Sequence, residues 1–164
     1  MKKVAIICTL LLVFGFTMHE DQSAGYDYYP VLMDLEDLRE SVEFQSPRNL
    51  ENPAKFYIKG DYLFVSEKYA GIHVFNNQNP YDPVNVGFIR IPGCLDMAVK
   101  ASVLYADNAI DLVAIDLSDP EKPTLASRLT DVFPEITPPG GHIPYQFRKE
   151  QRPAGTVIVE WKNR

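Results

Sequence analysis

Two stretches of this chain repeat each other at a spacing of 40 residues. The first, GIHVFNNQNPYDPVNVGFI, covers residues 71–89, and the second, DLVAIDLSDPEKPTLASRL, covers residues 111–129. Prolines and apolar residues coincide at Pro80/Pro120, Pro83/Pro123, Ile72/Leu112, Val74/Ala114, Phe75/Ile115 and Ile89/Leu129. Upstream the offset becomes 41, at Lys59/Lys100, Leu63/Leu104 and Phe64/Tyr105. Repeats of about 40–45 residues made of short strands are typical of propeller blades with four strands each.

Each repeat unit is predicted to form four short strands joined by turns. In the first unit these are Phe56–Lys59, Tyr62–Ser66, Ile72–Phe75 and Val84–Ile91, and in the second Met97–Lys100, Val103–Ala106, Leu112–Asp116 and Thr124–Leu129. The loops NNQNPYDP and DLSDPEKP carry Asn, Asp and Pro, which favour turns. A last strand is expected at Thr156–Trp161. The sequence therefore predicts an all-β fold over residues 55–164: a partial β-propeller of about two four-stranded antiparallel blades.

Residues 25–54 are expected to form a short N-terminal helix and a connector. Apolar residues recur at helical spacing within Val31–Val42, at Leu32, Leu35, Leu38 and Val42. Acidic residues come early in this stretch and Arg39 comes later, which suits the helix dipole. This helix is expected to cover part of one face of the first unit.

The first 24 residues have the pattern of an export signal. Lys2 and Lys3 precede an apolar run over residues 4–16, which is shorter than the roughly 20 residues of a membrane span. Cleavage could fall anywhere from Gly15 to Ala24, and an uncleaved anchor is the alternative. We therefore expect an exported protein of the periplasm or cell envelope, peripheral to the membrane at most.

The charge of the chain argues against a nucleic-acid partner. Its formal net charge is −6, and it has no basic stripe that would bind phosphates.

Cys94 lies between apolar residues in IPGCLDMAV, where a free cysteine behaves as a small hydrophobic residue.

The stretch DLVAIDLSDPEKP resembles the LVIVD repeat of exported bacterial β-propeller proteins. The residues that carry the resemblance are Leu112, Val113, Ile115, Asp116, Leu117, Ser118, Asp119 and Pro120. In the first unit the match is weaker, with Asn76 at the Asp position. The resemblance implies a propeller and an envelope location. It implies no catalytic residues, because the family has no established common activity.

Two repeats are fewer than the four to eight blades with which propellers usually close. The chain is therefore expected to be a truncated member or a fragment, with an assembly closed by other chains as the alternative. An open stack leaves unpaired strand edges, through which self-association is possible.

Candidate catalytic and metal-binding residues do not form a recognisable site. The three histidines, His19, His73 and His142, have no partner at metal-ligand spacing. Asp107, Asp111, Asp116 and Asp119 form an acidic run without calcium-loop spacing, and turn capping is the simpler interpretation. We therefore predict no catalytic residue, metal or cofactor. The alternative is a metal-dependent periplasmic hydrolase or lactonase-like propeller enzyme that uses this acidic run.

The proline-rich stretch before the last strand is the candidate contact surface. It contains an aromatic and basic group at Tyr145, Phe147, Arg148, Lys149 and Arg152. Loops of this length tend to be functional or disordered. We therefore expect a non-catalytic interaction module that binds an unknown protein or glycan at the envelope.

Overall fold

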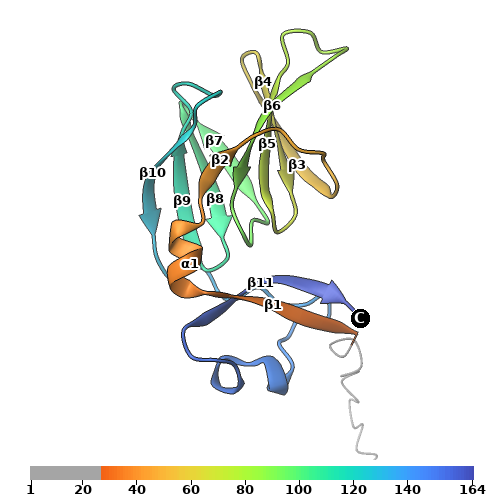
Figure 1. The fold of residues 1–164 in the computed structure, drawn as a ribbon, viewed down its shortest axis with the longest axis vertical. Coiled ribbons are helices and arrows are strands. Elements are labelled where there is room, and N and C mark those ends of the chain that lie inside the picture. The colour runs from red at the N-terminus through yellow and green to blue at the C-terminus, as the bar shows by residue number, and fades with distance from the viewer. Residues whose placement is uncertain (1–26) are drawn as a thin grey trace, which may run out of the picture.

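The computed structural model describes residues 27–164, so the expected signal peptide at 1–24 lies outside the described residues. Residues 27–164 form eleven strands in three antiparallel sheets, together with one short α-helix and two 3-10 turns (Figure 1). The predicted all-β class is confirmed, and the sheets do not close into a ring within this range. No helix within these residues is long and apolar enough to span a membrane.

The two repeat units form two sheets that stand side by side (Figure 1). The first sheet has the order β2-β6-β5-β4-β3, with bounds β2 Glu43–Gln45, β3 Pro53–Lys59, β4 Tyr62–Glu67, β5 Gly71–Asn76 and β6 Val84–Arg90. The second sheet has the order β10-β9-β8-β7, with bounds β7 Met97–Lys100, β8 Val103–Asn108, β9 Asp111–Asp116 and β10 Thr124–Leu129. All eight predicted strands of the repeats are present, and strand β2 adds a fifth strand that the sequence did not predict.

The two repeats use the same hydrogen bonds in their proline-bearing loops. The side chain of Asn76 accepts from the backbone N–H of Gln78 at 3.0 Å, and Asp116 accepts from Ser118 at 2.8 Å. Three residues later, Asn79 accepts from Tyr81 at 3.2 Å and Asp119 accepts from Glu121 at 3.1 Å. Side chains of Asn and Asp that bond the backbone two residues on favour turns, so the loop conformation follows from the sequence.

Gly71 begins β5 at a point where no side chain fits. Its φ is +146°, and a Cβ atom there would lie 2.1 Å from the carbonyl oxygen of Ile89. The close approach of β5 and β6 at this end of the first sheet therefore depends on glycine.

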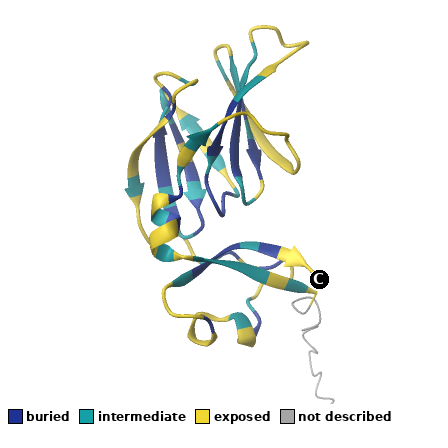
Figure 2. Cartoon of the chain, viewed as in Figure 1, coloured by how far each residue is buried: buried dark blue, intermediate teal, exposed yellow. Residues whose placement is uncertain are grey.

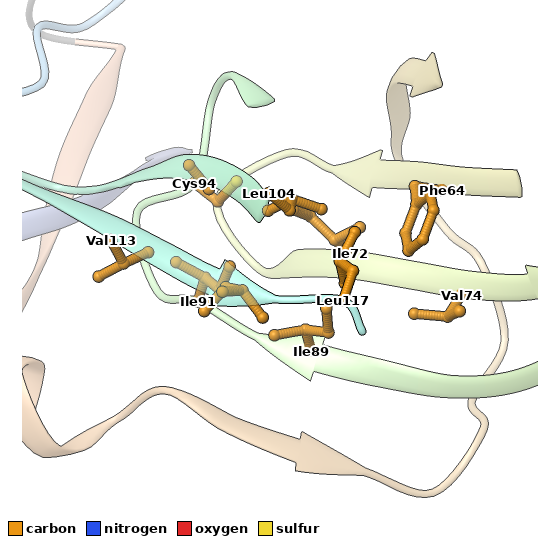
Figure 3. Close-up of a cluster of buried hydrophobic side chains, with 11 residues drawn as sticks. Phe64, Ile72, Val74, Ile89, Ile91, Cys94, Leu104, Val113 and Leu117 are labelled. Carbon is orange, nitrogen blue, oxygen red and sulfur yellow. The ribbon is translucent and has the colours of Figure 1, made fainter. Parts of the chain in front are cut away.

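The main core lies between the two sheets. Figure 3 shows side chains from both sheets meeting there, including Phe64, Ile72 and Val74 from the first and Leu104 and Val113 from the second. The buried members are Phe64, Ile72, Val74, Ile89, Ile91, Cys94, Leu104, Ala106, Val113, Ile115 and Leu117. Strand alternation sends the members that lie in strands to the faces that meet, while Ile91, Cys94 and Leu117 reach this core from the segments that follow β6 and β9.

The first and last strands of the described chain pair with each other. Strand β1 (Tyr28–Asp34) runs antiparallel to β11 (Thr156–Asn163), and the two form a ribbon below both sheets (Figure 1). A second core forms around this ribbon from Leu38, Ala109, Ile136, Val157, Ile158, Val159 and Trp161. The indole N–H of Trp161 donates to the carbonyl oxygen of Ile136 at 2.8 Å, which satisfies the polar atom of this buried ring.

The expected helix over Val31–Val42 is wrong in extent and position. Residues 28–34 form β1 instead, because they pair with β11, and the helix α1 covers only Leu35–Glu40. Leu38 of α1 packs into the second core, and Arg39 bonds residues of the second unit. The helix therefore contacts the second unit, and the first sheet is covered in part by the connector around Arg48 instead.

Candidate functional site: two open sheet faces

The face of the first sheet that points away from the second sheet exposes large apolar side chains. We call it the first outer face, and it consists of Phe56 and Ile58 on β3, Leu63 and Val65 on β4, and His73 and Phe75 on β5, as cross-strand pairing shows. Phe56 is 74% exposed and Ile58 is 57% exposed, whereas their cross-strand partners are half-buried. Strand β3 is the exposed edge of this sheet in Figure 2.

The second sheet also has an open face on the side away from the first sheet. We call it the second outer face, and its residues are Tyr105 on β8, Leu112 and Ala114 on β9, and Leu129 on β10. Leu129 is 59% exposed and Tyr105 is 37% exposed. A hollow of about 250 Å³ lies on this face, and Phe133, at 40% exposure, lines it together with Tyr105 and Leu112. Contiguous exposed apolar side chains of this kind mark interaction surfaces.

Part of the first outer face is closed by a buried polar cluster. His73 is fully buried, and its Nε2 lies 2.6 Å from Oε2 of Glu67. The other oxygen of Glu67 accepts from Arg48 at 2.7 Å. The guanidinium of Arg48 lies 4.0 Å from the ring centroid of Phe88, which in turn packs on His73. The connector therefore covers the β5–β6 half of this face and leaves the β3–β4 half open.

Burial and hydrogen bonding act in opposite directions on Glu67. Burial raises the pKa of its carboxyl, but the hydrogen bonds from His73 and Arg48 outweigh burial, and the net pKa is lowered. The second ring nitrogen of His73 lies 3.4 Å from Nδ2 of Asn85. Because the buried polar atoms of the cluster have partners, we interpret it as a structural clamp rather than a reactive site.

A second polar cluster joins α1 to the second sheet. Arg128 on β10 donates to Asn108 at 2.6 Å and to the fully buried Asp111 at 3.0 Å. Arg39 on α1 also reaches Asp111, at 3.4 Å, and the backbone N–H of Asp131 donates to the same carboxylate at 2.9 Å. Charged groups with this many partners are satisfied inside the protein.

The four aspartates of the acidic run do not converge on one point. Asp107 accepts from the backbone N–H groups of Leu95 and Asp96, and burial raises its pKa. Asp111 is held by arginines, and the remaining two, Asp116 and Asp119, hold turns. Among residues 27–164 no group of three or more His, Cys, Asp or Glu side chains is placed to hold a metal ion.

Cys94 is fully buried between the two sheets. Burial raises the pKa of its thiol well above the ordinary value, and the nearby carboxylate of Asp107 adds to the effect. A thiol held neutral in this way is a poor nucleophile.

The residues of the predicted contact loop point in different directions. Tyr145 is 67% exposed, and Arg148 and Lys149 are exposed as well. Phe147 is half-buried and packs edge-on against Trp161, with ring centroids 5.9 Å apart. Arg152 is buried and paired with Glu135. Three of the five side chains are therefore available at the surface, and the other two hold the loop against the second core.

From the sequence we expected an open stack that can self-associate through its exposed blade edges, but we did not identify the residues of the two outer faces as a candidate site. The signal was present in the repeat itself: residues that are buried in one unit have apolar counterparts in the other, but only one pair of faces is covered. No protein-family model matches the chain, and no curated protein and no solved structure matches it.

Proposed function

We propose that this chain is a non-catalytic protein-interaction module of the cell envelope, built from two propeller-type blades. The observation that carries the proposal is the gathering of large exposed apolar side chains, Phe56, Ile58 and Leu129, on the two outer faces. Monomeric soluble proteins rarely leave such surfaces uncovered. The blade interpretation is supported by the 40-residue repeat and by the order of four consecutive strands in each sheet.

The chemistry of the open faces favours a protein partner over a glycan. Aliphatic and aromatic side chains dominate both faces, and hydrogen-bonding groups that would orient sugar hydroxyls are few. The envelope location rests on the sequence, where Lys2 and Lys3 precede the apolar run over residues 4–16.

The proposal is tested by capture from envelope extracts on the immobilised protein. We compare the natural chain with Phe56→Glu on the first outer face and with Leu129→Glu on the second. Tyr29→Glu is the control, because Tyr29 is exposed but lies on β1 of the ribbon, outside both outer faces and the contact loop.

We expect the natural chain and the control to retain the same partner and at least one face variant to lose it, because a glutamate at a buried apolar contact is left without hydrogen-bond partners. Equal capture by all four proteins would contradict the proposal. So would the absence of any partner together with turnover of a hydrolase substrate.

A further inference from the structure

The contact between the two sheets shows what kind of surface fits the outer faces. We call this contact the template. On one side the first sheet presents Phe64, Ile72, Val74 and Ile89, all 2% exposed or less. On the other side the second sheet presents Leu104, Ala106, Val113 and Ile115, flanked by Met97 and Val99 on β7. The repeat makes these two sheets copies of one unit, so the template relates one unit to the next.

The second outer face repeats the side of the template that belongs to the first sheet. Its residues are displaced by 40 or 41 positions, in the pairs Phe64/Tyr105, Ile72/Leu112, Val74/Ala114 and Ile89/Leu129. Every position is apolar or aromatic in both units. In the first sheet this surface is buried, whereas in the second Tyr105 and Leu129 are exposed, Leu112 is half-buried and only Ala114 is buried.

The first outer face repeats the other side of the template in the same way. The corresponding pairs are Phe56/Met97, Ile58/Val99, Leu63/Leu104, Val65/Ala106, His73/Val113 and Phe75/Ile115. His73 is the one position that is already covered, by the connector that carries Arg48. The remaining five apolar residues are available.

The two outer faces differ from the template in the size of their side chains. The second outer face has Ala114 where the first sheet has Val74, so it is smaller at that position. The first outer face is larger, since Val65 replaces Ala106, Ile58 replaces Val99 and Phe75 replaces Ile115. The loss of volume at Ala114 offsets part of this added volume.

An ion pair across the template would also recur in the next contact. In the template, Nζ of Lys55 on the first unit lies 2.6 Å from Oδ1 of Asp96 on the second. These two residues are themselves repeat equivalents, 41 positions apart. The next contact in the series would therefore place Asp96 of one unit beside Lys55 of the following unit, which again joins opposite charges.

The loops supply a further pair of matching positions. In the template the hydroxyl of Tyr62 lies 3.0 Å from the carboxylate of Glu121. The repeat equivalents of these residues are Val103 and Tyr81, so a polar pair is replaced by an apolar one. Tyr81 is 98% exposed, and this contact would account for such a ring on the tip of a loop.

We propose that the second outer face binds the first outer face of another copy of this chain, head to tail. This inference rests on the proposed function and names its partner. The contact is heterologous, so a series of copies closes into a ring when the rotation between units permits. Since propellers close with about four to eight blades, two to four copies with two blades each would complete a ring.

The mass of the purified chain in solution tests the proposal directly. Light scattering after size exclusion is expected to give two to four times the protomer mass found by mass spectrometry. Leu129→Glu and Phe56→Glu should each raise the concentration for half-assembly by about thirtyfold or more, the effect of one unpaired polar group in an apolar contact. Tyr29→Glu should assemble like the natural chain.

Mixing the two face variants distinguishes a head-to-tail contact from a symmetric one. Leu129→Glu keeps an intact first outer face and Phe56→Glu keeps an intact second outer face. An equimolar mixture is therefore expected to form a dimer that neither variant forms alone. Tyr81→Glu should weaken assembly, because Tyr81 would contact Val103 of another copy. It should leave far-UV circular dichroism unchanged, because Tyr81 is an exposed loop side chain.

A natural chain that is monomeric at every soluble concentration would overturn the proposal, as would assembly that both face variants retain. If the chain is a monomer that captures a different envelope protein through these faces, the partner is not a second copy, but the proposed function stands. A monomer whose faces capture nothing overturns both.

Discussion

Glu67 carries a buried negative charge at the end of β4, beside the fully buried His73. Burial raises its pKa, but the hydrogen bonds from His73 and Arg48 prevail and hold the pKa below the ordinary value of 4.5. A carboxyl whose folded pKa is lowered contributes stability above its unfolded pKa and loses that contribution as the pH falls through the folded pKa. The clamp on the first sheet is therefore expected to weaken in acid.

Replacing Glu67 by glutamine tests this at the residue scale. We expect Glu67→Gln to lower the free energy of unfolding by about 1–3 kcal/mol at pH 7, because two charge-assisted hydrogen bonds are lost. The difference from the natural chain should shrink as the pH falls below 4.5 and the natural carboxyl becomes protonated. Urea unfolding at pH 7 and at lower pH measures both quantities.

The exposed Glu51 provides the control for this prediction. Glu51→Gln should leave the unfolding free energy nearly unchanged at either pH. A loss for Glu67→Gln that is equal at pH 7 and in acid would show that the charge of Glu67 is not what stabilises the clamp.

Helix α1 is too short to be stable on its own, since isolated helices of fewer than about 12 residues are marginal in water. Its stability must come from Leu38, which is fully buried, and from the hydrogen bonds of Arg39 to the second unit. The stability of α1 therefore depends on its contacts with the second core and with the second unit.

Truncation of Leu38 is expected to release this helix. Leu38→Ala should cost about 2–4 kcal/mol through lost burial and the cavity that remains. Leu35→Ala, at a half-buried position of the same helix, should cost about half as much. Urea unfolding gives the two losses, and hydrogen exchange shows whether residues 35–40 lose protection first. Equal losses for the two variants would contradict the role given to Leu38.

The strands of the repeats could be predicted because each is encoded locally. Short apolar runs are separated by Asn, Asp and Pro at fixed offsets, and β7 and β10 begin and end at the predicted residues. The segment over residues 28–34 could not be predicted in the same way. Its conformation is set by pairing with β11, more than 120 positions away, and Leu32 and Leu35 happen to match helical spacing.

The candidate site was predictable only in part for a related reason. The repeat shows which positions are equivalent, but burial depends on what covers them, and the sequence contains no local sign that Phe64 is covered while Tyr105 is open. In the predicted contact loop, Arg152 is buried because it pairs with Glu135, a partner 17 residues away. Composition alone made it look like a surface cation.

At the scale of the whole molecule, two cores of different construction support the fold. One lies between the two sheets, which have nine strands together, and the other lies around the two-stranded ribbon and a long loop. Regions with fewer strands and more loop open at lower free energy. The ribbon core is therefore expected to unfold before the core between the sheets.

Trp161 reports on this difference, because it is the single tryptophan of the chain and belongs to the ribbon core. In urea, its fluorescence transition should fall at a lower concentration than the far-UV circular dichroism transition, which follows all the strands. Superimposable transitions would indicate one cooperative unit and would contradict two separable cores.

The pairing of β1 with β11 has a mechanical consequence. Tyr28 lies opposite Asn163, so both ends of the described chain leave the fold at the same corner. A force that pulls these ends apart loads the ribbon from that corner, and its hydrogen bonds then bear the load one after another instead of together. If the N-terminal side were tethered to a surface, tension on the other end would break the hydrogen bonds between β1 and β11 in order from that corner, while the two sheets kept their contact.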